Sequence, residues 1–325
     1  MDIDYSVIIR TTGKAGEKYA KLLASIDRLV PSPKEVIVVL PQGYALPQER
    51  LGWETFFFSP KGMVIQRMTG IQRCHTQYAL VCDDDVQFSP DFVRKLHKPL
   101  EDGMGGLSIA PLYSFFPQKG LRTMIDAVLG SGIPTVFHKN RYCSVLRTTG
   151  YSYNRRLHKN GEYGQTQSAA WTCFYANIEA LRAVDFEVEQ QWLDAHGYSA
   201  LDDQTMFYKA WLRGIKTIVV TDASYEHLDA RTSTRENREP VLFSRMFNRI
   251  VFWHRYIYLQ ENSLAGKCWA GICFGYYQAA NDLYAFLRGV PAEEKRIKNR
   301  ARKEAKAYLR SDSYKKLPPV KKTTK

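Results

Sequence analysis

Three consecutive aspartates, Asp83, Asp84 and Asp85, directly follow the apolar run at 78–82 in this chain of 325 residues. Side chains two apart on an extended strand point the same way, so we expect Asp83 and Asp85 to face one ligand and Asp84 to face elsewhere. Carboxylate oxygens suit hard cations such as Mg²⁺ or Mn²⁺. A solvated acidic turn is the other interpretation, but ligands of open α/β sheets bind beyond the carboxyl ends of the strands. The triplet therefore predicts a divalent-cation site.

A second acidic pair, Asp202 and Asp203, opens a predicted helix that runs through Leu212 and ends at Gly214. A carboxylate at a helix start can accept a proton from a hydroxyl group, and adjacent carboxylates raise one another's pKa toward neutral pH. The pair would also cap the helix and complement its dipole without any chemistry. Because the chain also carries a metal motif, we favour a general base in this pair.

Further polar and aromatic residues are candidates for the same site. His227 follows a predicted strand at 216–221, and a neutral imidazole can complete an oxygen-rich metal site, although a hydrogen-bonded surface histidine is equally expected. Arg67 and Arg73 precede the predicted strand at 78–82 that leads into the three aspartates, which we call the aspartate strand. Each arginine either pairs with phosphate or is solvated. Trp171 forms either an apolar wall against a sugar face or part of the core.

The elements that must position these residues are readable from periodicity. The predicted order is a strand at 5–10, a helix at 19–29, a strand at 35–40, a helix at 63–77 and a strand at 78–82. Strand–helix–strand units of this kind pair their strands in parallel. Ser89 and Pro90 predict the start of the next helix, as N-cap and first helical residue. Thr11 and the aspartates then lie at the same edge of the sheet.

The second half of the chain is less regular. Residues 105–165 are rich in Gly, Tyr, Ser and Arg, which predicts loops and short strands that shape a pocket. Ordered elements follow at 169–175, 177–184, 201–212 and 216–221. Beyond 240 we expect aromatic helices, and the stretch at 268–287 is too polar to span a bilayer.

The composition narrows the function classes. A hydrophobic content of 45% is ample for a core, and the six cysteines lack zinc spacing, so we interpret them as reduced core residues. The net charge of +13 is concentrated at 291–325, where 13 Lys/Arg and 4 Asp/Glu give +9. With no nucleic-acid recognition motif, this basicity favours an anionic membrane surface over nucleic acid. The first residues lack a secretory signal, so we expect a cytoplasmic protein.

Taken in order, these segments resemble the family 2 glycosyltransferases with the GT-A fold over roughly residues 5–230. The matching segments are Ser6–Thr12, Glu35–Val39, Gly62–Gly70, Tyr78–Asp91, Ala170–Leu181 and Leu201–Gly214. The resemblance implies an α/β fold with a Rossmann-like, mixed and mostly parallel sheet flanked by helices, and a C-terminal helical extension. We expect a nucleotide-sugar-binding half at 1–105, an acceptor-binding half at 106–230, aromatic amphipathic helices at 231–290 and a basic tail at 291–325.

The resemblance also implies an inverting, metal-dependent transfer from a nucleotide-sugar to an acceptor hydroxyl. Counting back from Gly214 places the family's catalytic base at Asp203. Mn²⁺ or Mg²⁺ would be held by Asp85, with His227 aimed at the metal or diphosphate. The donor would contact Thr11, Gln42, Arg67, Asp83 and Asp84, and the acceptor Trp171 and Asp202. Two departures stand out: Gln42 lies in the turn where an aspartate usually reads uracil, and Arg10 ends the first strand where proline is frequent.

A UDP-sugar is the favoured donor, with dTDP- or GDP-sugars as alternatives. The resemblance further implies assembly of a surface polysaccharide or glycolipid on a glycan or lipid-linked acceptor at the inner face of the membrane. Residues 243–258 and the basic tail would attach the protein there, or the aromatic helix would pack on its own domain or on a second subunit of a homo-oligomer.

Two other functions fit parts of the pattern. A nucleotidyltransferase shares the fold and the acidic metal ligands but needs a Gly-rich basic phosphate loop, which residues 11–16 match only faintly. A non-catalytic, membrane-attached binding protein would explain the basic tail but would not need Asp203.

Overall fold

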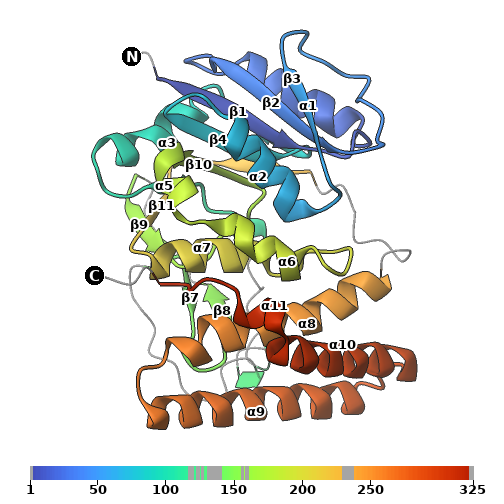
Figure 1. Ribbon diagram of the computed structural model, residues 1–325. Helices are drawn as coiled ribbons and strands as arrows, with labels where there is room; N and C mark the ends of the chain where they lie inside the picture. Colours follow the sequence, from blue (N-terminus) through green and yellow to red (C-terminus); the bar gives the residue numbers. More distant parts are fainter. Residues whose placement is uncertain are drawn as a thin grey trace.

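The computed structural model describes residues 3–115, 141–154, 161–228 and 238–321, together with positions 121, 125, 128, 129 and 157. Its centre is an eight-stranded sheet in the order β3-β2-β1-β4-β10-β6-β11-β9, with helices on both faces (Figure 1). The strands span Tyr5–Arg10 (β1), Glu35–Pro41 (β2), Thr55–Ser59 (β3), Tyr78–Asp83 (β4), Leu107–Ile109 (β6), Tyr163–Thr166 (β9), Cys173–Asn177 (β10) and Thr217–Val220 (β11). The predicted mixed α/β sheet is confirmed.

The helices of the sheet region form two layers. They are α1 (Glu17–Asp27), α2 (Met63–Arg73), α3 (Phe92–Glu101), α5 (Ile178–Ala183), α6 (Gln190–Leu193) and α7 (Asp202–Leu212). Alternate β1 side chains enter different cores: Val7 and Ile9 pack with α1 and α3, whereas Ile8 packs with α2 and α7. Helix α2 lies very close to the sheet, since a Cβ on Gly70 would stand 2.4 Å from Ile8 Cγ2.

The topology brings several strand ends to one edge. β1 pairs in parallel with both β2 and β4, so the carboxyl ends of these three strands lie together. β10 runs antiparallel to β4, with Cys173 opposite Cys82. The segment that enters β10, including Trp171, therefore lies beside the end of β4.

Three local details differ from the sequence prediction. The helix expected at 63–77 ends at Arg73, because Cys74 is extended. Helix α3 begins at Phe92 rather than after Ser89, whose hydroxyl donates to Asp91 Oδ1. The edge strand β3 was not predicted, since four of its five residues are exposed or only partly buried and give no clear alternation.

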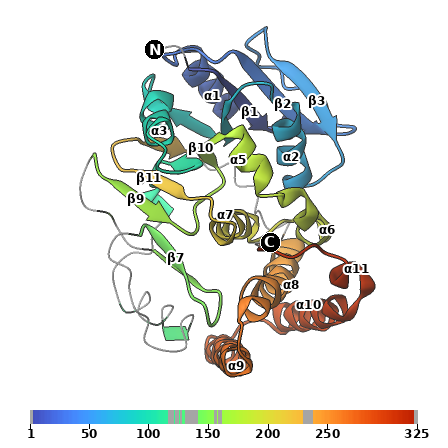
Figure 2. The ribbon, with the colours of Figure 1, turned by 60° about the vertical axis from the view of Figure 1, so that its left-hand side comes forward.

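The C-terminal helices are α8 (Arg238–Tyr256), α9 (Leu264–Leu287), α10 (Ala292–Arg310) and α11 (Asp312–Lys315), and they gather on the α7 side of the sheet (Figure 2). Helix α8 buries Phe243, Phe247 and Phe252, so the aromatic segment packs on its own domain. The segment expected as a basic tail is largely α10, which packs on α8 through Ile297 and Ala301. No helix within the described ranges is both long and apolar enough to cross a membrane.

Candidate active site

The chain turns sharply at the end of β4. Asp84 and Asp85 form a turn, and β5 (Val86–Phe88) follows and pairs with β12 (Tyr225–His227). This pairing places His227 Nε2 3.4 Å from Asp85 Oδ2. The two residues predicted to hold metal are therefore neighbours, although no group of three or more His, Cys, Asp or Glu that could hold a metal ion occurs in the described part of the chain.

The carboxylate of Asp83 pairs with two arginine side chains of the protein. Arg10 Nε donates to its Oδ1 over 3.0 Å, and Arg67 Nη2 donates to the same atom over 2.9 Å. Burial raises the pKa of Asp83, but the two guanidinium groups outweigh burial and hold that pKa below its ordinary value. The extended geometry that would have aimed Asp83 and Asp85 at one ligand ends at Asp83, because a turn follows.

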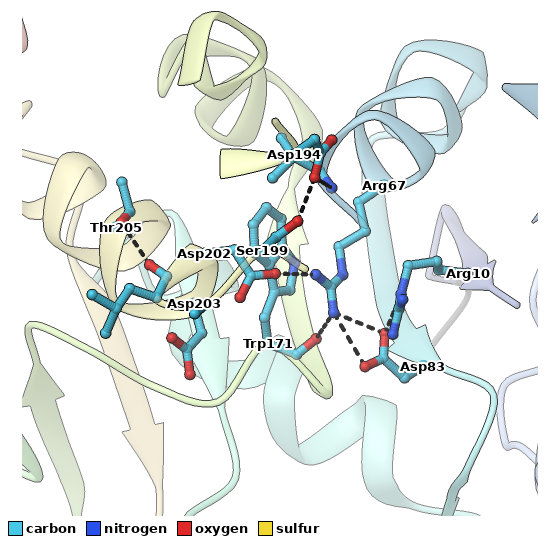
Figure 3. A network of polar contacts seen from close by, with 12 residues as sticks. Arg10, Arg67, Asp83, Trp171, Asp194, Ser199, Asp202, Asp203 and Thr205 are labelled. Atoms are coloured by element: carbon cyan, nitrogen blue, oxygen red, sulfur yellow. Dashed lines mark hydrogen bonds and ion pairs between the residues drawn. The ribbon is translucent and has the colours of Figure 1, made fainter. Parts of the chain in front are cut away.

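Arg67 joins the aspartate strand to the second acidic pair (Figure 3). Its Nη1 donates to Asp202 Oδ2 over 2.6 Å, while its Nη2 donates to Asp83. The guanidinium also lies 4.5 Å from the centre of the Trp171 ring, and the residue is 3% exposed. In this structure Arg67 positions two carboxylates, and its predicted donor contact stays a prediction. Arg73 is exposed over the Phe57 ring.

The start of α7 holds Asp202 and Asp203 apart. Leu201 precedes them with a φ of 69°, a left-handed conformation that is rare for leucine and often found at functional sites. Its carbonyl accepts from Thr205 N over 2.9 Å, which fixes the first turn. Figure 3 shows Asp202 directed to Arg67 and Asp203 directed away from it.

The environment of Asp203 suits a base at neutral pH. Burial, followed by the charge of Asp202, raises the pKa of Asp203 to about 7. Burial also raises the pKa of Asp202, against the charge of Arg67. Asp203 borders two cavities, one of about 720 Å³ and one of about 190 Å³.

The remaining predicted residues lie at the same sheet edge. Thr11 Oγ1 donates to Asp84 Oδ2 over 2.5 Å, and the Thr11 carbonyl accepts from Gln66 Nε2 over 3.1 Å. Burial raises the pKa of Asp84 to about 6. Gln42 is exposed in the turn after β2. Trp171 is 2% exposed and packs edge-on against Phe186, so its ring belongs to the core, and its contact with a sugar stays a prediction.

Two residues of the site were not found from the sequence. Arg10 was interpreted only as a departure from proline, yet it is a partner of Asp83. Asp194 accepts from the backbone N–H groups of Val64 and Ile65, which caps the start of α2 from a distant segment. Neither contact has a local signal, because each joins residues that only the tertiary fold brings together.

Residues 50–184 match the family described as Glycosyl transferase family 2. No curated protein matches the sequence significantly.

Similar solved structures share the fold at low identity. S. aureus TarS 1-349 is 15% identical with a TM-score of 0.51, covering 92% of this chain and 79% of that one. The longer S. aureus TarS is 13% identical with a TM-score of 0.53, covering 96% of this chain and 50% of that one. GalNAc-T7, solved with UDP, GalNAc and Mn²⁺, is 13% identical with a TM-score of 0.52, covering 89% of this chain and 58% of that one. Residues 50–184 are therefore similar to family 2 glycosyl transferases, and the chain as a whole shares the fold of TarS and GalNAc-T7.

Proposed function

We propose that the protein transfers a sugar from a nucleotide-diphosphate donor to an acceptor hydroxyl with inversion. The observation that carries this proposal is the Arg67 bridge, which holds Asp202 at the end of the aspartate strand and leaves Asp203 directed away. One carboxylate with a pKa of about 7 then faces the cavities, where it can deprotonate an attacking hydroxyl directly. A single displacement of this kind inverts the anomeric carbon.

The donor would bind at the joined ends of β1, β2 and β4. Thr11, Asp84 and Gln42 stand at these three ends and offer hydrogen-bonding groups to a nucleoside. A UDP-sugar is the favoured donor, and GalNAc-T7, which shares the fold, is solved with UDP. A thermal-shift screen of UDP-, dTDP- and GDP-sugars with Mn²⁺ tests this assignment, since a ligand of the folded state raises apparent stability. No shift with any donor contradicts it.

Asp85 and His227 fit one cation. A carboxylate and an imidazole are acceptable ligands for Mn²⁺, and two protein ligands leave coordination positions for diphosphate oxygens and water, as is usual at phosphate-binding metal sites. When bound, Mn²⁺ or Mg²⁺ would neutralise the charge of the departing diphosphate. Asp83 is already neutralised by Arg10 and Arg67, so we assign it to holding the strand end on the nucleotide side.

Asp85→Asn is expected to abolish the stabilisation that Mn²⁺ and UDP together give the protein. The change keeps the side-chain shape but removes the charge that attracts the cation. At a ligand concentration of 100 times Kd, wild type should gain about 2.7 kcal/mol of unfolding free energy, measured by thermal shift. His227→Ala should reduce the gain, whereas Asp222→Asn, which changes an exposed aspartate outside the site, should retain it. A full gain in Asp85→Asn contradicts the assignment.

A peripheral membrane contact through α9 completes the proposal. This helix leaves large apolar side chains exposed along its length, among them Ile272 (64%), Leu283 (60%) and Phe286 (69%). Lys267 and Arg288 lie near its two ends, so anionic lipid headgroups would be matched by charge as well as by apolar contact. These features of α9 support the proposal that the acceptor belongs to a surface polysaccharide or glycolipid pathway at the cytoplasmic membrane face.

The double variant Ile272→Glu/Leu283→Glu is expected to lose most binding to phosphatidylglycerol vesicles, because two charges would enter the apolar contact. Co-sedimentation measures the loss. Trp53→Glu/Phe58→Glu is the matched control, since Trp53 (46%) and Phe58 (47%) are exposed on the sheet side of the molecule. Equal binding by both double variants would remove the basis for a contact through α9.

A further inference from the structure

The largest cavity that borders Asp203 lies between the start of α7 and the helices α8, α9 and α10. Its volume is about 720 Å³, and Asp202 and Asp203 form part of its wall. Five basic side chains also line it: Arg245, Arg249, Arg288, Lys298 and Arg302. The cavity therefore joins the candidate base to a strongly cationic surface.

Only part of this positive charge is matched by the protein. Arg302 Nη2 pairs with Asp282 Oδ1 over 2.6 Å, and Arg249 Nη1 donates to the Gly150 carbonyl over 3.0 Å. The carboxylate of Asp202, which also lines the cavity, is paired with Arg67. Arg245 on α8 and Lys298 on α10 make no ion pair or hydrogen bond with any residue that the structure describes.

Arg245 and Lys298 are not placed to hold α8 and α10 together. Cations that hold α8 and α10 together do so through pairs, as Arg300 does with Glu239. Arg245 and Lys298 line the cavity without such partners; Lys298 is half-buried there, and Arg245 is exposed at the cavity. Like charges gathered in a concave site raise the local concentration of anions.

The other cavity at Asp203 differs in charge. It has a volume of about 190 Å³, and Ser152, Asn154 and Ser168 supply neutral polar groups. Its described lining contains no basic side chain. The two spaces beside Asp203 thus offer different chemistry, one neutral and one cationic.

We propose that the cationic cavity binds an acceptor that carries phosphate or carboxylate groups close to the hydroxyl that is glycosylated. This rests on the proposed function, in which Asp203 is the base. The acceptor oxygen forms a bond to the anomeric carbon while the bond from that carbon to the donor phosphate oxygen breaks. The hydroxyl proton passes to Asp203, and the bonding electron pair leaves with the nucleoside diphosphate. Arg245 and Lys298 hold the anionic groups during this step.

Binding of three oligosaccharides tests the proposal without turnover: a phosphomannan oligosaccharide, oligogalacturonate and neutral maltopentaose. By isothermal titration calorimetry at low salt, wild type should bind at least one of the two anionic probes about tenfold more tightly than maltopentaose. Arg245→Gln/Lys298→Gln should lose this preference. Arg296→Gln/Lys303→Gln, which removes two exposed charges from α10 outside the cavity, should keep it. Equal binding of all three probes by wild type, or a preference that survives in Arg245→Gln/Lys298→Gln, overturns the proposal.

Vesicles distinguish a lipid headgroup from a soluble glycan as the source of the anion. If phosphatidylglycerol supplies it, the Arg245→Gln/Lys298→Gln variant binds phosphatidylglycerol vesicles less tightly than the Arg296→Gln/Lys303→Gln control does. If a soluble glycan supplies it, the two variants bind the vesicles equally and differ only with the anionic oligosaccharides.

Donor turnover separates this inference from the proposed function. A wild type that hydrolyses a nucleotide-sugar but transfers preferentially to maltopentaose overturns the anionic acceptor and leaves glycosyl transfer in place. Anion binding through Arg245 and Lys298, without turnover of any UDP-, dTDP- or GDP-sugar, overturns the proposed function instead.

Discussion

Asp203→Asn is expected to lower the rate of sugar transfer by about 10²- to 10⁴-fold, the usual contribution of a positioned general base. Asparagine has nearly the same shape and can still accept the hydrogen bond from Gln204 N, which spans 2.6 Å in the structure. It cannot take a proton from the acceptor. The loss should therefore appear in kcat, measured as release of nucleoside diphosphate with a saturating acceptor.

The pH profile gives this prediction a second readout. Because burial and Asp202 raise the pKa of Asp203 to about 7, wild-type kcat/KM should rise with pH up to about 7 and level off above it. The Asp203→Asn variant should lack this rise. A rise that persists unchanged in the variant contradicts the assignment of the base.

Stability provides the control for folding. A carboxyl whose pKa is raised in the folded state is most favourable at pH values where it is protonated, and its contribution is lost as pH rises through about 7. Asp203→Asn should consequently be at least as stable as wild type at pH 8. Asp222→Asn, at an exposed position, should retain activity. A variant that is inactive because it unfolds would show the opposite change in Tm.

The sequence predicted most reliably those elements that have a clear local hydrophobic pattern. Runs of β-branched residues at 5–10 and 35–40 predicted β1 and β2, which are buried on both faces. The helix expected at 201–212 matches α7 to within one residue at its start and to the residue at its end, Leu212. These elements follow from hydrophobic periodicity and a helix stop at Gly214, which depend only on near neighbours.

The contacts that assemble the site do not depend on near neighbours in the sequence. The β5–β12 pair that brings His227 to Asp85, and the Arg67 bridge between Asp83 and Asp202, each join distant segments. The packing face of the basic helix α10 was not predicted either. Ile297, Ala301 and Ala305 recur there at four-residue spacing, but the surrounding charged residues obscured this narrow apolar stripe. Tertiary packing decides such features, so periodicity alone could not predict them.

Arg67→Met is expected to reduce both stability and activity. Arg67 is 3% exposed and neutralises two buried carboxylates, and loss of one partner from a buried pair typically lowers the free energy of unfolding by about 3–5 kcal/mol. Asp83 would retain Arg10, so the uncompensated charge would fall mainly on Asp202. Urea denaturation measures the loss, and donor turnover should fall because Asp202 and Asp203 share the first turn of α7.

A second change tests whether the bridge itself is responsible. Adding Asp202→Asn to Arg67→Met removes the unpaired negative charge of residue 202, so the double variant should be more stable than Arg67→Met alone. The coupling energy between the two changes should be about 0.5–3 kcal/mol. Arg67→Lys keeps the charge but lacks the fork that reaches both carboxylates, and it should be intermediate. Arg73→Met alters an exposed arginine of the same helix and should leave the urea midpoint nearly unchanged. Additive effects of Arg67→Met and Asp202→Asn would mean that Asp83, and not the link between the aspartate strand and α7, is the partner that matters.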